Sequence, residues 1–129
     1  MPTLEERIQK SQTRVVKLVF PNLLSHQDHM FGGTVLQWMD EVAVITGTRL
    51  SRKKLVTASL DRIDFKKGIP VGTLVELIGT VKRVGRTSMQ VEVDVVMEQL
   101  YTDERESVIK GMFTLVTIDE NRRPVPVLA

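Results

Sequence analysis

The chain has 129 residues, 42% of them hydrophobic and 26% charged, with a formal net charge of +2. This size predicts one domain with a real core, and no apolar run reaches the ~18 residues of a membrane span. The apolar content excludes a disordered chain, and the few aromatic residues without a basic stripe argue against a nucleic-acid binder. The lack of cysteine excludes disulfides and thiolate chemistry. Because the first residues hold no apolar signal segment, we expect a cytoplasmic protein.

The elements follow from hydrophobic periodicity. A β-branched strand is expected at 14–20, before Pro21, and a polar loop follows at 22–30. Residues 34–49 leave almost no polar face, which predicts a buried helix. The pattern then changes to a period of two, with strands expected at 55–65, 74–84, 88–100 and 108–118.

This order predicts an α+β fold, in which a curved antiparallel sheet of about five strands wraps round one long central helix. The domain is expected to cover residues 8–120, with short tails at 1–7 and 121–129. Because one helix covers only one face of the sheet, we expect the outer face or the edges to pack on another copy of the chain.

The segment Phe31–Ala43, FGGTVLQWMDEVA, is the most specific pattern. Further segments follow in order: Val56-Thr57, Asp64-Phe65, Ile69-Pro70 with Gly72, and Val84 to Met89. Over roughly residues 8–120 they resemble the hotdog-fold acyl-CoA thioesterases. The resemblance implies a hydrolase of fatty acid metabolism that splits acyl-CoA into free acid and CoA, with no metal or redox cofactor. It also implies a homo-oligomer, a dimer that assembles further into a trimer of dimers, or hexamer.

The resemblance implies that Asp40 is the catalytic residue, and its position inside the apolar run of the helix agrees with this role. A partly desolvated carboxylate is a better base toward water, and it could instead attack the thioester carbon as a nucleophile. The sequence leaves both roles open. The plainer alternative is an exposed helix carboxylate, as expected for Glu41 beside it.

Gly32 and Gly33 stand where the helix begins. Their backbone N–H groups, with the positive end of the helix dipole, are expected to stabilise the oxyanion of the thioester carbonyl. A tight turn alone would also explain them, and the two interpretations are compatible.

The preceding loop departs from the family pattern. Ser25 stands where the family commonly has Asn, and Asp28 where it commonly has Gly. The resemblance implies that Ser25 and His26 assist catalysis from a neighbouring subunit. Two histidines, His26 and His29, without a third ligand are weak evidence for a metal, so no metal site is expected.

The substrate is expected to contact two further segments. Thr57 and Ser59 alternate with Ala58, and one face of their strand is expected to line the partner's site, although cross-strand hydroxyl pairing would explain them equally. In the family, the segment Gly85, Arg86, Thr87 and Ser88 lies along the CoA arm. Arg86 is the best candidate for a phosphate contact, because a guanidinium matches phosphate oxygens.

Three alternatives remain open at this point: two other functions, and a purely structural assembly domain that predicts neither CoA binding nor turnover. A hotdog hydratase or dehydratase would use a histidine paired with an acid, yet both histidines here precede Asp40 in the loop. A non-catalytic acyl-CoA-binding module would explain the departures at Ser25 and Asp28, and it predicts CoA binding without turnover.

Overall fold

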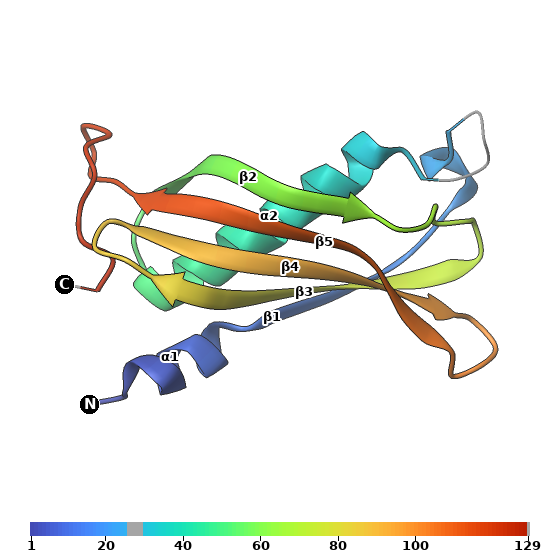
Figure 1. Cartoon of the computed structure of the whole chain (residues 1–129), viewed down its shortest axis with the longest axis horizontal. Coiled ribbons are helices and arrows are strands. Elements are labelled where there is room, and N and C mark those ends of the chain that lie inside the picture. The colour runs from blue at the N-terminus through green and yellow to red at the C-terminus, as the bar shows by residue number, and fades with distance from the viewer. Residues whose placement is uncertain (26–29, 129) are drawn as a thin grey trace.

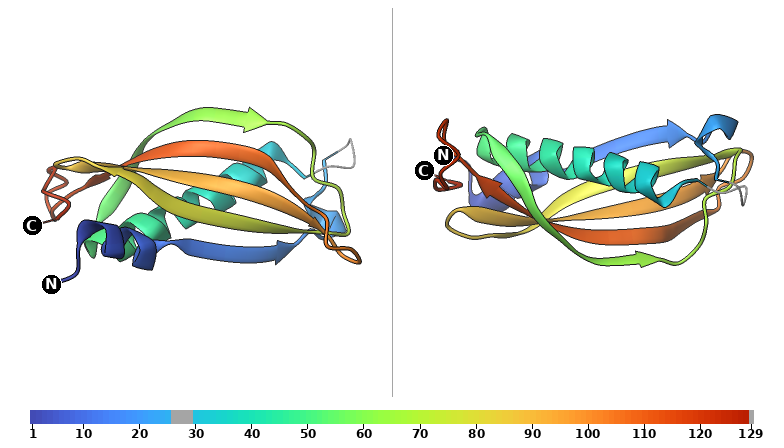
Figure 2. Two further views of the ribbon diagram at one scale, coloured as in Figure 1. Left: turned by 60° about the horizontal axis from the view of Figure 1, so that its bottom comes forward. Right: turned by 90° about the horizontal axis from the view of Figure 1, so that it is seen from above.

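The fold is an antiparallel sheet curved around one long helix, as the computed structural model shows for residues 1–25 and 30–128 (Figures 1 and 2). The strands lie in the order β1-β3-β4-β5-β2. The elements are α1 (Leu4–Ser11), β1 (Thr13–Leu18), the 3-10 turn η1 (Pro21–Leu23), α2 (Gly32–Ser51), β2 (Leu55–Phe65), β3 (Thr73–Val84), β4 (Ser88–Gln99) and β5 (Arg105–Thr117). The expected α+β hotdog architecture is confirmed.

Helix α2 packs one side against the concave face of the sheet. Its buried residues recur at helical spacing: Val35, Met39, Val42, Ala43, Thr46, Gly47, Leu50 and Ser51. The opposite side is open, since Gln37, Glu41 and Ile45 are exposed. Within a single chain, α2 is therefore less completely buried than its apolar run predicted.

Both ends of the chain pack on the domain. Helix α1 begins at Leu4 behind a capping box made by Thr3 and Glu6, and Arg7 donates a hydrogen bond to the Leu50 carbonyl. At the other end Val127 is buried, and its N–H donates to the Arg86 carbonyl at 2.9 Å. These contacts link segments far apart in sequence, which local periodicity does not reveal.

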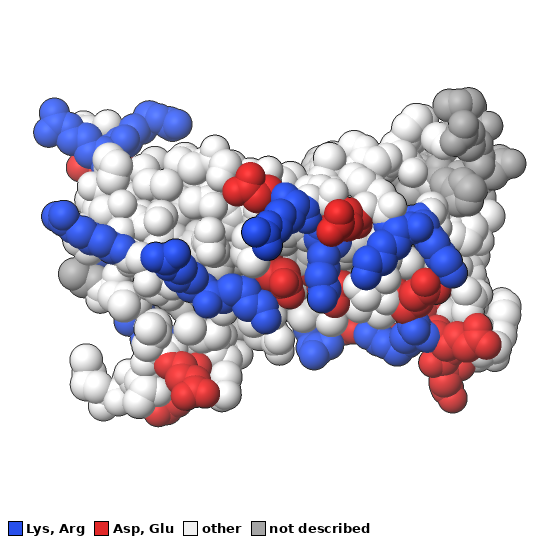
Figure 3. All heavy atoms as spheres, viewed as in Figure 1, with Lys and Arg blue, Asp and Glu red and all other residues white. Residues whose placement is uncertain are grey.

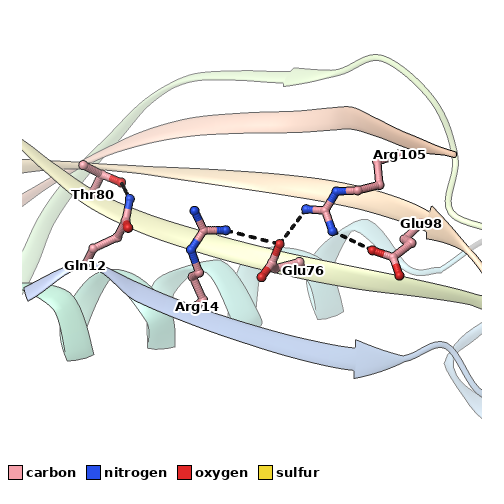
Figure 4. Close-up of polar contacts among 6 residues, drawn as sticks. All are labelled: Gln12, Arg14, Glu76, Thr80, Glu98 and Arg105. Carbon is pink, nitrogen blue, oxygen red and sulfur yellow. Dashed lines mark hydrogen bonds and ion pairs between the residues drawn. The ribbon is translucent and has the colours of Figure 1, made fainter. Parts of the chain in front are cut away.

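The outer face of the sheet is polar, with Lys and Arg mixed among Asp and Glu (Figure 3). At its centre Glu76 of β3 accepts from Arg105 of β5 at 2.6 Å and faces Arg14 of β1 at 3.4 Å (Figure 4). Arg105 also pairs with Glu98 at 2.5 Å. The hydrogen bond from Arg105, with both positive charges, lowers the pKa of Glu76 below its usual value of 4.5 despite partial desolvation.

Replacing Glu76 by Gln is expected to lower the free energy of unfolding by about 1 kcal/mol at pH 7, because two partly exposed arginines lose their shared carboxylate. A carboxylate whose pKa is lowered by folding stabilises the protein above its unfolded pKa, and that contribution disappears as the pH falls through the folded pKa. The difference between variant and wild type should therefore shrink below pH 4. Urea unfolding at pH 7 and pH 3, with the exposed Glu120→Gln as control, measures it. An equal difference at both pH values would contradict the ionic explanation.

Candidate functional site

Asp40 lies in the third turn of α2, on the side that faces the edge strand β2. Its side chain is half-buried, and the Thr57 hydroxyl of β2 donates to its Oδ1 at 2.6 Å. Such a short bond from a hydroxyl to a carboxylate holds the acceptor in one orientation. No other described residue is seen to donate a hydrogen bond to this carboxylate, so its second oxygen could accept a proton.

The N-terminus of α2 lies two turns away from Asp40. Gly32 and Gly33 are exposed and open the helix, and its N-cap residue, Phe31, makes no capping bond through its side chain. Thr34 N–H donates to the Phe31 carbonyl, whereas no backbone acceptor for the two glycine N–H groups is found among the described residues. Unpaired N–H groups at a helix N-terminus favour a developing negative charge.

A pocket of about 310 Å³ adjoins this end of α2. Its walls are mostly apolar and its rim carries two lysines: it is lined by Met30, Gly32, Val35, Phe65, Lys66, Lys67, Gly68, Ile69 and Ile109. Sequence analysis gave Phe65 and Ile69 no role in the site. They meet Gly32 because β2 runs antiparallel to α2, so the end of β2 returns to the start of the helix.

The expected catalytic residues form two separate groups within one chain. Asp40 lies eight positions after Gly32, which is about 12 Å along a helix axis. A thioester carbonyl held within about 3 Å of the glycine N–H groups would be out of direct reach of the Asp40 of the same chain.

Ser25 is half-buried and lies at the base of the loop that precedes α2. A β-bridge between Leu24 and Met30 and a hydrogen bond from Phe31 N–H to the Leu23 carbonyl hold this base against the start of the helix. Ser25 directly follows Leu24 of this bridge, on the side of the loop rather than of the helix. His26, Asp28 and His29 lie outside the described residues.

Thr57 and Ser59 do not share a face, and the expectation that they would is wrong. Thr57 pairs with the buried Leu115, whereas Ser59 pairs with Thr114, the neighbour of Leu115 that faces outward. A β-bulge at this point adds one residue to β2 and reverses the alternation. Thr57 therefore points toward α2 of its own chain, and Ser59 lies on the outer face.

The segment from Gly85 to Ser88 forms the tight β3–β4 hairpin, closed by a bond from Gly85 N–H to the Ser88 carbonyl at 2.8 Å. The Thr87 carbonyl accepts from Thr117 N–H, which anchors the hairpin to β5. The Arg86 side chain is exposed. The hairpin lies at the end of the molecule opposite the N-terminus of α2 (Figure 1), so one chain does not bring Arg86 and Gly32 together.

Two kinds of feature are absent from the described part of the chain. No group of three or more His, Cys, Asp and Glu side chains there is arranged to hold a metal ion. No helix in the same residues is both long and apolar enough to cross a membrane.

Comparisons with known proteins agree on one family. The sequence model of the thioesterase superfamily matches residues 27–103. The uncharacterized acyl-CoA thioester hydrolase YkhA of Bacillus subtilis is 40% identical over 98% of this chain and 74% of its own length.

Solved structures give the same answer. An apo-hexameric acyl-CoA thioesterase superposes with a TM-score of 0.91 and 40% identity, over 94% of this chain and 78% of its own. The Staphylococcus aureus acyl-CoA hydrolase, in complex with butyryl-CoA and CoA, has a TM-score of 0.90 and 30% identity. The match covers 95% of this chain and 74% of the S. aureus chain. Variants of that hydrolase with an asparagine, an aspartate or a threonine changed to alanine are also similar. This chain therefore belongs to the thioesterase superfamily.

Proposed function

We propose that this chain hydrolyses the thioester of an acyl-CoA to a free carboxylic acid and CoA, with Asp40 as its general base or nucleophile. The proposal rests on the Asp40 carboxylate, whose Oδ1 accepts a 2.6 Å hydrogen bond from the Thr57 hydroxyl beside an open sheet edge. The chain that carries this carboxylate belongs to the thioesterase superfamily. Fatty acyl-CoA is the expected substrate class.

The reaction balances with water alone. As a base, Asp40 takes a proton from water while the hydroxide forms a bond to the carbonyl carbon. The tetrahedral oxyanion then collapses, the C–S bond breaks, and the CoA sulfur receives the proton. As a nucleophile, Asp40 would form a mixed anhydride with release of CoA, and water would then cleave the anhydride. Neither course requires a metal or redox cofactor.

The spacing of three residues supports this assignment. In the S. aureus hydrolase, an asparagine, an aspartate and a threonine were each changed to alanine. The numbers of residues that separate these three positions are the same as those that separate Ser25, Asp40 and Thr57 here. We infer that Thr57 positions Asp40. Ser25, with His26 beside it, occupies the asparagine position with a shorter side chain, which suits a supporting role.

A second copy of the chain completes the site in our proposal. Asp40 and the N–H groups of Gly32 and Gly33 are too far apart within one chain to act on one carbonyl. The exposed β2 edge beside Asp40 suits pairing with another β2, which would bring the helix N-terminus of the partner close. We propose such a dimer, and a hexamer built from three dimers; a hexameric acyl-CoA thioesterase among the similar structures supports this.

We place the CoA phosphates near the β3–β4 hairpin, with Arg86 as the cation. Glycine at 85 lets a ligand approach the backbone, and Thr87 and Ser88 add hydroxyl groups. Beside this hairpin a hollow of about 220 Å³ is lined by Arg83, Gly85, Ser88, Met89, Gln90 and Thr114. Ser59 pairs with Thr114, which lines this hollow, and we therefore place Ser59 beside it on the outer face of the sheet. An acyl-CoA substrate and a chain without cysteine support a cytoplasmic location.

The test is the release of free thiol from acyl-CoA esters of increasing length, from acetyl to palmitoyl. We expect turnover with at least one of them, and the dependence of kcat/KM on chain length reports the depth of the acyl site. No thiol release from any ester, together with saturable CoA binding, would refute the hydrolase and leave an acyl-CoA-binding module.

A further inference from the structure

A basic hollow of about 440 Å³ lies between α1 and the C-terminal end of α2. Its lining comes from both helices: Pro2, Glu6, Arg7, Lys10, Arg49, Leu50 and Arg52. Arg7 and Lys10 are at helical spacing on α1, whereas Arg49 lies in the last turn of α2 and Arg52 is its C-cap residue. We call this feature the α1–α2 hollow. The first α2 residue of its lining, Arg49, follows Asp40 by nine positions, which is about 13 Å along the helix axis.

The positive charge of the α1–α2 hollow is not cancelled within the described chain. None of the ion pairs found there includes any of its four cations. Its one carboxylate, Glu6, is engaged in the capping box with Thr3. The surplus therefore faces the hollow.

Two of the arginines are held in place by neutral acceptors. Arg7 Nη2 donates to the Leu50 carbonyl at 2.7 Å. Arg49 donates to the Gln12 carbonyl at 2.8 Å and to the Lys10 carbonyl at 2.7 Å. Because backbone carbonyls orient these guanidinium groups without neutralising them, the hollow is prepared for an anion before one arrives.

Helix stabilisation alone does not account for this charge. Cations near a helix C-terminus offset a partial charge of about −0.5, and two helices end here, so about one positive charge would suffice. Four cations and one carboxylate leave roughly two positive charges in excess. Three of the four are arginines, whose planar fork matches the oxygens of a phosphate.

We propose that the α1–α2 hollow binds a phosphate-bearing small molecule through Lys10, Arg52 and the two oriented arginines. The volume accommodates a diphosphate group with part of its carrier. A free nucleotide or metabolite and the diphosphate of CoA itself share this chemistry. The proposal does not depend on hydrolysis at Asp40, since it concerns binding at another place on the chain.

Calorimetric titration with inorganic pyrophosphate at low salt tests it on the whole protein. We expect one saturable site per chain, with at least a 10-fold weaker affinity in the double variant Lys10→Gln/Arg52→Asn. Within residues 1–25 and 30–128 neither side chain makes a hydrogen bond or ion pair that the fold requires, and Asn suits the left-handed backbone of position 52, where φ is 56°. The matched control is Lys110→Gln/Arg122→Asn, which removes two exposed charges elsewhere, one of them also at a positive φ of 61°.

The absence of saturable binding to the wild type would overturn the proposal, as would equal weakening in both double variants. Competition with CoA then identifies the source of the phosphate. If CoA displaces pyrophosphate, and the hollow variant but not the control loses CoA affinity, the α1–α2 hollow holds the phosphates of the substrate, in place of the β3–β4 hairpin proposed above. If both ligands bind together, the hollow serves a separate phosphorylated ligand.

Discussion

Changing Asp40 to Asn is expected to lower kcat for acyl-CoA hydrolysis by about 10³-fold, within the usual contribution of a positioned base. Asn keeps the shape of the side chain and can still accept the 2.6 Å hydrogen bond from Thr57. It cannot take a proton from water or form an anhydride. The measurement is free-thiol release under saturating acyl-CoA, with circular dichroism to show that the variant is folded.

The neighbouring carboxylate is the matched control for this prediction. Glu41 follows Asp40 on the helix and is exposed, so Glu41→Gln should keep kcat within about 2-fold. Thr57→Val, which removes only the hydrogen bond to Asp40, should give an intermediate loss of about 10-fold, in kcat more than in KM, as expected for a positioning residue. Comparable activity of Asp40→Asn and Glu41→Gln would remove Asp40 from the mechanism.

Changing Gly79 to Ala is expected to lower the free energy of unfolding by about 3 kcal/mol and the Tm by roughly 10 °C. Strand β3 passes closest to α2 here, so an added Cβ would overlap Thr46 Oγ1 and lie 2.9 Å from Val42 Cγ1. Thr46 is fully buried, and its hydroxyl donates to the Val42 carbonyl at 2.7 Å. Relieving the overlap would break this bond or push α2 off the sheet.

Two glycines on the facing helix, α2, give graded controls in the same thermal unfolding experiment. At Gly47 an added Cβ would meet the flexible ends of Leu115 at 2.6 Å and Leu55 at 3.0 Å, so Gly47→Ala should cost less. At Gly33 it would meet nothing within 4 Å, and Gly33→Ala should leave the Tm unchanged or slightly raised. Equal Tm values for Gly79→Ala and Gly33→Ala would show that the close approach at β3 is not a packing constraint.

The amino-acid sequence predicted the fold well because its signals are local. The apolar run at 34–49 lies within α2, and the period of two at 55–65 reproduces β2 as the structure has it. The last strand begins at Arg105, before the expected 108, because its first residues already pair with β4, with Arg105 opposite Glu98. Family membership also followed from the sequence, since the Phe31–Ala43 motif lies within the matched region.

The site was predicted less completely. Asp40 and the two glycines stood out as a motif, but their separation along α2 was not considered. The α1–α2 hollow was missed because its cations come from two distant segments. The spacing of Arg7 with Lys10, and of Arg49 with Arg52, was its only signal in the sequence.

The sequence by itself determined the order of the long helix and the five strands, because this order depends on periodicity and on residues close together in the chain. The role of Asp40 stays a prediction. Only the tertiary structure decided that Thr57 holds Asp40, because a β-bulge between Thr57 and Ser59 reverses the faces of β2. It also decided that Asp40 and Gly32 stand apart, since the rise of a straight helix carries them about 12 Å from each other.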